Sequence, residues 1–113
     1  ITPRYRGAHG GYWALVEGRR DLVGSTLHRV DAGIDTGEVL SQATFAVTAR
    51  DSIATYPLLH VAAGLPLLLE VVESVASGLP LPAARPIDCG PSKLWYHPTL
   101  WSYLLHRWVG GVS

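Results

Sequence analysis

Apolar and polar residues alternate along two stretches in the first half of the chain, which is the pattern of half-buried strands. Residues 23–30 are rich in β-branched side chains and alternate in part. Residues 39–47 place their valines, Ala43 and Phe45 on one face. Between them, the aspartates and glycines of residues 31–37 predict an ordered loop with unusual backbone angles. The pattern therefore predicts two strands joined by a structured loop.

Helical spacing marks three other segments. A short helix is predicted over residues 12–17, and a long one, with apolar residues at i, i+3, i+4 and i+7, between Thr48 and Ser77, where Gly78 is a natural C-cap. Its most apolar part, residues 58–72, is shorter than the roughly 20 residues of a membrane span, so we interpret it as a buried helix. An aromatic helix over residues 98–108 is expected to pack on the body of the protein.

Composition sets the class of protein. The 113 residues have room for one domain, and 48% hydrophobic with 16% charged residues is typical of a globular chain. Residues 79–91 hold four prolines, so we expect one unit over residues 1–78, followed by a Pro-rich linker and aromatic tail over residues 79–113. Nine basic and nine acidic residues give a formal net charge of zero. This balance argues against a nucleic-acid groove or an anionic membrane surface as partner.

Several kinds of site are excluded by what the sequence lacks. The single cysteine, Cys89, cannot form an internal disulfide or a Cys-based zinc site, which favours a reducing, cytoplasmic setting. The chain has no dinucleotide, P-loop, nucleophile-elbow or zincin motif. His9, His28, Asp31 and Asp35 are metal-ligand types, but their spacing matches no metal motif, and we predict no metal.

Two carboxylates, Asp31 and Asp35, lie four residues apart on the predicted loop. An aspartate in such a loop commonly accepts hydrogen bonds from nearby amides. Alternatively, Asp35 orients a histidine and stabilises its charged form, which gives a general acid or base near neutral pH. Residues 35–37 also match the D-T-G of aspartic peptidases, but the helix after Thr48 disagrees with their almost all-β fold. The peptidase remains a minor alternative.

Four sequence segments occur in an order and at a spacing that together match one protein family. They are Pro3-Arg4-Tyr5-Arg6-Gly7, Trp13-Ala14-Leu15, Gly24 to Asp31 and Gly33 to Leu40. Together they resemble the folate-dependent formyltransferase family, which includes glycinamide ribonucleotide formyltransferase and methionyl-tRNA formyltransferase. The resemblance runs from about Ile1 to Gly78 and implies an α/β fold. It corresponds to the C-terminal half of a Rossmann-like formyltransferase domain, with a short helix, two strands and a long helix, followed by the aromatic tail.

The resemblance also implies a reaction. Family members transfer a formyl group from 10-formyltetrahydrofolate to a primary amine, here a glycinamide ribonucleotide-like or another small amine. Their catalytic groups are an Asn and a His of an N-x-H motif and an Asp that Asp35 matches. Because the N-x-H precedes the segment matched by Pro3 to Gly7, we expect a fragment that holds Asp35 alone and is inactive by itself. A formyltetrahydrofolate hydrolase and a non-catalytic remnant are the alternatives.

Binding residues follow from the same resemblance. Those expected to contact the folate pterin are Val30, Asp31, Ala32, Gly33 and Ile34. Those expected to border the amine or the folate tail are Arg4, Tyr5, Arg6 and His9, and the alternative for these four is a solvated basic loop. His28 is interpreted as a core histidine, with a site residue as the alternative, and His60, His97 and His106 are interpreted as structural. Beyond the amine and folate, we expect self-association through an apolar face that half a sheet leaves uncovered, and no membrane or nucleic-acid partner.

Overall fold

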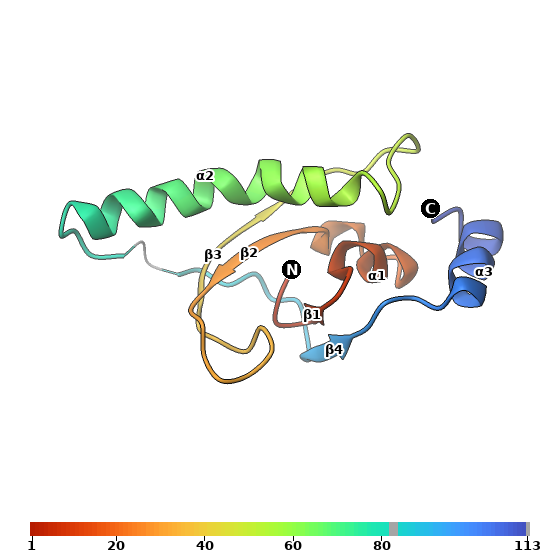
Figure 1. The fold of residues 1–113 in the computed structure, drawn as a ribbon, viewed down its shortest axis with the longest axis horizontal. Coiled ribbons are helices and arrows are strands. Elements are labelled where there is room, and N and C mark those ends of the chain that lie inside the picture. The colour runs from red at the N-terminus through yellow and green to blue at the C-terminus, as the bar shows by residue number, and fades with distance from the viewer. Residues whose placement is uncertain (82–83, 113) are drawn as a thin grey trace.

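The computed structural model describes residues 1–81 and 84–112. In chain order the elements are β1 (Tyr5–Gly7), α1 (Gly10–Val16), the short 3-10 helix η1 (Arg20–Leu22), β2 (Gly24–His28), β3 (Val39–Thr44), α2 (Tyr56–Ala76), β4 (Lys93–Trp95) and α3 (Leu100–Gly110). Figure 1 shows α2 lying along the β2–β3 pair. In that view β1 and β4 lie below this pair, on the side away from α2, and α3 lies at one end of the molecule. The expected α/β character is confirmed.

The strands form two separate pairs. β2 and β3 are antiparallel, with Thr26 opposite Gln42 and an irregularity between Leu27 and His28. β1 and β4 are parallel, with Tyr5 opposite Lys93. Both predicted strands are therefore present, although β2 ends at His28, and the residues that follow it belong to the loop.

The pair β1–β4 was not predicted. The segment of β1 was expected to be a loop, and β4 lies in what was expected to be tail. Each has only three residues, too few to show a period of two, and their pairing joins opposite ends of the chain. The amide of Lys93 donates to Arg4 O at 3.1 Å, and the amide of Ala8 donates to Trp95 O at 3.0 Å. The proposed boundary between residues 1–78 and 79–113 stays a prediction.

The long helix α2 begins later than predicted. The Asp51 carboxylate accepts hydrogen bonds from the Thr48 amide and hydroxyl at 2.9 and 2.7 Å, which forms a turn before the helix. The helix itself begins at Tyr56, next to Pro57, because proline is well accommodated in a first helical turn. It ends at Ala76, and Gly78 adopts a left-handed φ of 66°, as expected for a C-terminal glycine.

The prediction that α2 is buried is wrong for the described chain. One side faces β2 and β3, and of its residues only Tyr56 is buried. The exposed apolar residues are Leu58, Val61, Leu65, Leu68, Leu69, Val72 and Val75. The helix therefore has one apolar side that packs against β2 and β3 and a second apolar side that no part of the described chain covers. By length and composition alone α2 is able to cross a membrane, a test that core helices also pass.

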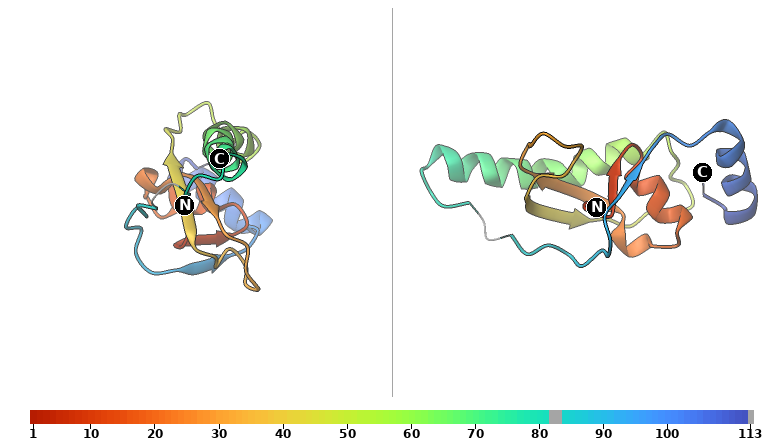
Figure 2. Two further views of the ribbon diagram at one scale, coloured as in Figure 1. Left: turned by 90° about the vertical axis from the view of Figure 1, so that its left-hand side faces the viewer. Right: turned by 90° about the horizontal axis from the view of Figure 1, so that it is seen from below.

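The buried core lies around α1, not under α2. Its members are Ile1, Tyr5, Tyr12, Ala14, Leu15, Leu22, Val23, Tyr56, Cys89 and Val112. The aromatic tail reaches this core through Trp95, which stacks on Trp13 with ring centres 4.8 Å apart. Trp101 and Trp108 remain exposed on α3, at the far end of the molecule in Figure 2. Packing of the tail is thus confirmed for Trp95 and wrong for these two tryptophans.

Candidate functional site

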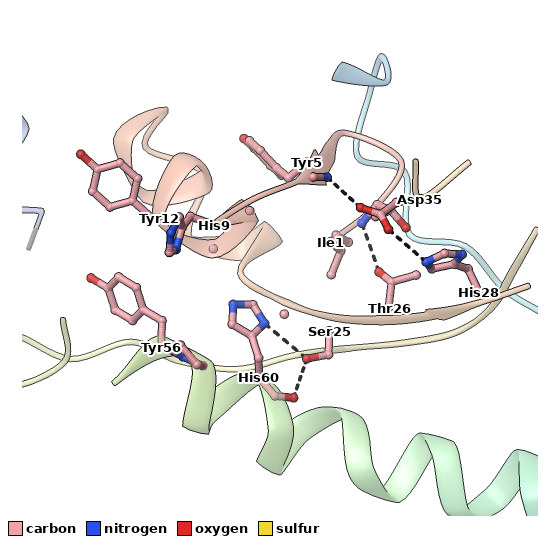
Figure 3. A pocket seen from close by; sticks show the side chains of 16 residues that line it. Ile1, Tyr5, His9, Tyr12, Ser25, Thr26, His28, Asp35, Tyr56 and His60 are labelled. Carbon is pink, nitrogen blue, oxygen red and sulfur yellow. Dashed lines mark hydrogen bonds and ion pairs between the residues drawn. The ribbon is translucent and has the colours of Figure 1, made fainter. Parts of the chain in front are cut away.

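A pocket of about 380 Å³ opens between β1, α1, β2 and the first turns of α2 (Figure 3). This volume lies within the range of small-molecule sites. Asp35 and His28 line one end of the pocket, and His9 and His60 line the part nearer α1 and α2. The arrangement brings Asp35 together with two of the residues that the sequence assigned to the amine site, Tyr5 and His9.

Asp35 has an unusual backbone and a well-held side chain. Its φ is 51°, a left-handed value that costs a residue other than glycine on the order of 1–3 kcal/mol. Its Oδ2 accepts a hydrogen bond from the Gly7 amide at 2.7 Å, and its Oδ1 lies 3.5 Å from His28 Nε2. The carboxylate is therefore fixed in direction at the pocket while it stays partly open to solvent.

The loop before Asp35 is ordered by its own hydrogen bonds. Asp31 Oδ1 accepts from the Thr36 hydroxyl at 2.6 Å and from the Gly33 amide at 3.0 Å. These bonds, first that from Thr36, hold the pKa of Asp31 below its usual range. At Gly37 a Cβ would collide with the carbonyl oxygen of Arg29, so only glycine fits there. Asp31 thus has the loop-ordering role, and the folate contacts of residues 30–34 stay a prediction.

His28 is a site residue, which the sequence analysis held only as the alternative. Its Nδ1 lies 2.8 Å from Arg29 O, and because a carbonyl only accepts, this nitrogen carries a proton. The other nitrogen, Nε2, faces the Asp35 carboxylate. That contact is an ion pair only when Nε2 carries a proton as well. The signal was present in the sequence, since His28 ends a strand that leads directly into the Asp35 loop.

Arg4, which precedes β1, and Arg6, which lies in β1, have different surroundings. Arg4 pairs with Glu17 at 2.9 Å and does not line the pocket. Tyr5 is buried and donates its hydroxyl hydrogen to the same carboxylate at 2.7 Å. Arg6 instead reaches the loop, where its Nη1 donates to Ile34 O at 2.8 Å. Contacts of these three residues with an amine or with folate stay predictions.

Two further histidines lie at the pocket. His9 has a left-handed φ of 56° before α1, and its Nε2 is 2.9 Å from His97 Nδ1. Burial, and then the neighbouring His97, lower the pKa of His9. His60 lies on α2 with its Nδ1 3.3 Å from Ser25 Oγ, and burial lowers its pKa too. Both rings are thus favoured in their neutral form.

No group of three metal-ligating side chains comes together within residues 1–81 and 84–112. His28 and Asp35 face each other, whereas His9 is turned toward His97. The histidines and aspartates that the sequence offered as ligands are therefore distributed over separate contacts.

Comparison with known proteins gives a consistent result. The family model described as formyl transferase matches residues 1–65. Methionyl-tRNA formyltransferase of Pelotomaculum thermopropionicum is 33% identical over 79 residues, which cover 70% of this chain and 25% of that protein. The enzyme of the same name from Verminephrobacter eiseniae is 35% identical over 83 residues, covering 74% and 25%.

A relative with another name matches more of the chain. Mitochondrial 10-formyltetrahydrofolate dehydrogenase of Homo sapiens is 29% identical over 119 residues, which cover 98% of this chain and 13% of that protein. The chain spans about a quarter of the length of the bacterial relatives that it matches.

Proposed function

The chain belongs to the formyl transferase family, and on this premise we propose that the protein containing it transfers a formyl group from 10-formyltetrahydrofolate to a primary amine. The expected fold, part of a Rossmann-like formyltransferase domain, is confirmed by the family match and the parallel pair β1–β4. The observation that carries the proposal is the fixed Asp35 carboxylate at the pocket. A strained aspartate held by a backbone amide is typical of functional sites.

In the proposed reaction, a bond forms between the amine nitrogen and the formyl carbon, and the bond from that carbon to the folate nitrogen breaks. The proton lost by the amine goes to the folate nitrogen. The folate supplies an activated formyl group. Residues 30–34 are exposed, with Val30 and Ile34 at 94% and 58%, so this part of the Asp35 loop is open to a flat ring such as the folate pterin.

Asp35 acts on protons in this proposal. Its carboxylate stabilises positive charge on a histidine and accepts a hydrogen bond from a water that relays the proton of the amine. The Gly7 amide keeps the carboxylate pointed at the pocket, and His28 Nε2 lies 3.5 Å from its second oxygen. The Asn and His of the family motif are expected from another part of the protein, so this chain alone is expected to show no turnover.

A second function, release of formate to water, is the alternative, and one similarity supports a reaction of the same donor that needs no amine. The similarity to a 10-formyltetrahydrofolate dehydrogenase extends over 98% of the chain, whereas the methionyl-tRNA formyltransferases match 70% to 80% of it. In this alternative, water replaces the amine as the acceptor at the same site, and Asp35 keeps its role. The two functions therefore differ in acceptor and share the donor.

The test uses the full-length protein with Asp35→Asn, assayed against a panel of amines that includes glycinamide ribonucleotide, small amines and methionyl-tRNA. We expect kcat to fall at least about 100-fold, the usual contribution of a positioned acid or base. The matched control is Asp21→Asn, an exposed aspartate that pairs with Arg19 at 2.7 Å, and it should leave kcat unchanged. Unchanged formyl transfer in Asp35→Asn would refute the role of Asp35, and no transfer to any amine by the unaltered protein would refute the proposed function. Formate release without any amine would select the second function.

A further inference from the structure

The β1 strand holds the Asp35 loop at two points that are adjacent in sequence. The Gly7 amide donates to the Asp35 carboxylate at 2.7 Å. The neighbouring Arg6 donates from Nη1 to Ile34 O at 2.8 Å, the carbonyl of the peptide bond that leads into Asp35. One contact fixes the side chain, and the other fixes the backbone just before it. Together they define the direction of the carboxylate at a residue whose left-handed φ is not intrinsically favoured.

Arg6 is itself held from the C-terminal segment. Its Nε donates to Ser92 Oγ at 2.7 Å, and Ser92 directly precedes β4. A long arginine side chain loses conformational entropy when it is fixed, and a second hydrogen bond reduces the number of orientations that remain. The Ser92 contact thus orients the guanidinium so that its other nitrogen reaches Ile34 O.

The β4 strand gives this arrangement its rigidity. Lys93 and Trp95 bond the backbone around β1, and Trp95 stacks on Trp13 of α1. The carbonyl of Trp95 also lies so close to Gly7 that no side chain fits there, which explains glycine at this position, where φ is 90°. Ser92 is therefore tied to the same strand that supplies the Gly7 amide. It lies outside residues 1–65, the part that matches the family model.

We propose that Ser92 and Arg6 are positioning residues for Asp35, which connect the segment before β4 with the catalytic loop. The inference rests on the proposed function and adds a role for a segment that the family match does not reach. Arg6 then acts through the loop and does not bind the amine. Loss of the contact lets the Ile34–Asp35 peptide bond turn, so fewer molecules present the carboxylate in the productive direction.

The variants are made in the full-length protein. For Arg6→Lys, which keeps the charge but not both hydrogen bonds, we expect kcat to fall about 10-fold with KM for amine and folate within about twofold. For Ser92→Ala we expect a fall of about threefold, and Ser92→Thr, which keeps the hydroxyl, should restore kcat. Ser74→Ala removes a comparable hydroxyl bond, to Glu70 O on α2, and is the control expected to change nothing. Higher KM with unchanged kcat in Arg6→Lys would overturn the inference and support substrate binding instead.

A double-mutant cycle separates positioning from general structural damage. If Arg6 acts through Asp35, Arg6→Lys has no further effect on kcat in the Asp35→Asn background. The same loss in both backgrounds would overturn the inference. If the unaltered protein transfers no formyl group, the proposed function fails. If Asp35→Asn lowers kcat while Arg6→Lys and Ser92→Ala do not, only the present inference fails.

A measurement independent of turnover uses isotope-labelled glycine. The Gly7 amide resonance should shift when Asp35→Asn replaces the carboxylate, because the two groups are hydrogen-bonded. The amplitude of this shift should fall in Ser92→Ala and Arg6→Lys and be restored in Ser92→Thr. An unchanged amplitude in both variants would show that Asp35 is held without them and would overturn the inference.

Discussion

The pocket region and the outer helix faces are built in opposite ways. Around the pocket, backbone and side-chain hydrogen bonds fix the functional groups, and residues such as Leu22 are buried. On the outer sides of α2 and α3, apolar residues such as Leu58 and Trp108 are 71% and 91% exposed. Within the described chain, α3 even turns a polar residue inward, since His106 Nδ1 lies 2.8 Å from Tyr12 Oη. The positions of the functional groups at the site are therefore fixed without contacts from the apolar outer faces. These faces are exposed in the described chain and available for contacts with another protein surface.

The largest expected effect is on the free energy of unfolding, and it compares a leucine-to-alanine substitution near the pocket with the same substitution on the outer side of α2. Leu22→Ala removes a side chain that is 1% exposed, so it should lower the free energy of unfolding by about 2–5 kcal/mol. Leu58→Ala, on the outer side of α2, should change it by less than about 0.5 kcal/mol at protein concentrations low enough to keep the chain monomeric. Urea unfolding of both variants measures the difference. Equal losses in the monomer would show that the outer face of α2 is covered within a single copy.

The next effect concerns what covers that face. We propose that a second copy does so, because Leu58, Val61, Leu65, Leu68, Val72 and Val75 recur every third or fourth residue, the spacing of helix–helix seams, and none of them is charged. The triple variant Val61→Gln, Leu65→Gln, Leu68→Gln should weaken self-association of the chain at least about 10-fold. Glu73→Gln, a change on the same helix outside the stripe, is the control. Sedimentation that shows only monomer at every concentration would refute the proposal.

The sequence predicted the parts of the structure that depend on local pattern. The period of two located β2 and β3, and the turn residues located the Asp35 loop between them. Gly78 was a correct signal for the end of α2, because a left-handed residue after a helix favours glycine.

What the sequence could not give depends on distant contacts. β4 is three residues long and has its partner at the other end of the chain, so no local period marks it. The hydrogen bond from Arg6 to Ser92 depends on that pairing, so it could not be predicted from the sequence either. The prediction that α2 is buried was wrong, because apolar spacing indicates which sides of a helix are apolar. It does not indicate whether the same chain supplies a surface that packs against them.

A smaller effect concerns pH and the neutral histidines of the pocket. Burial lowers the pKa of His60 and His9 below the ordinary value of about 6.5. Below that value the unfolded chain binds more protons than the folded one, so stability is present above about pH 6.5 and is lost as the pH falls through it. Each histidine can contribute a slope of at most about 1.4 kcal/mol per pH unit.

Denaturant unfolding across this pH window measures the slope. His60→Gln should flatten it more than His9→Gln, because His60 is the more strongly buried of the two rings. A reference protein whose stability does not change between neutral and mildly acidic pH would contradict the prediction. So would an unchanged slope in both variants.

The smallest effect compares the two arginines beside β1. Arg4 and Glu17 form a pair near the surface, and such pairs contribute little because solvent screens both charges. Arg4→Gln and Glu17→Gln should therefore lower the melting temperature by no more than about 3 °C and leave kcat/KM within about twofold. Arg6→Lys should reduce kcat several times more, since its partner is the Asp35 loop. If Arg4→Gln instead raises KM for the amine about 10-fold while Glu17→Gln does not, Arg4 borders the amine site, and the pocket extends past β1 toward Glu17.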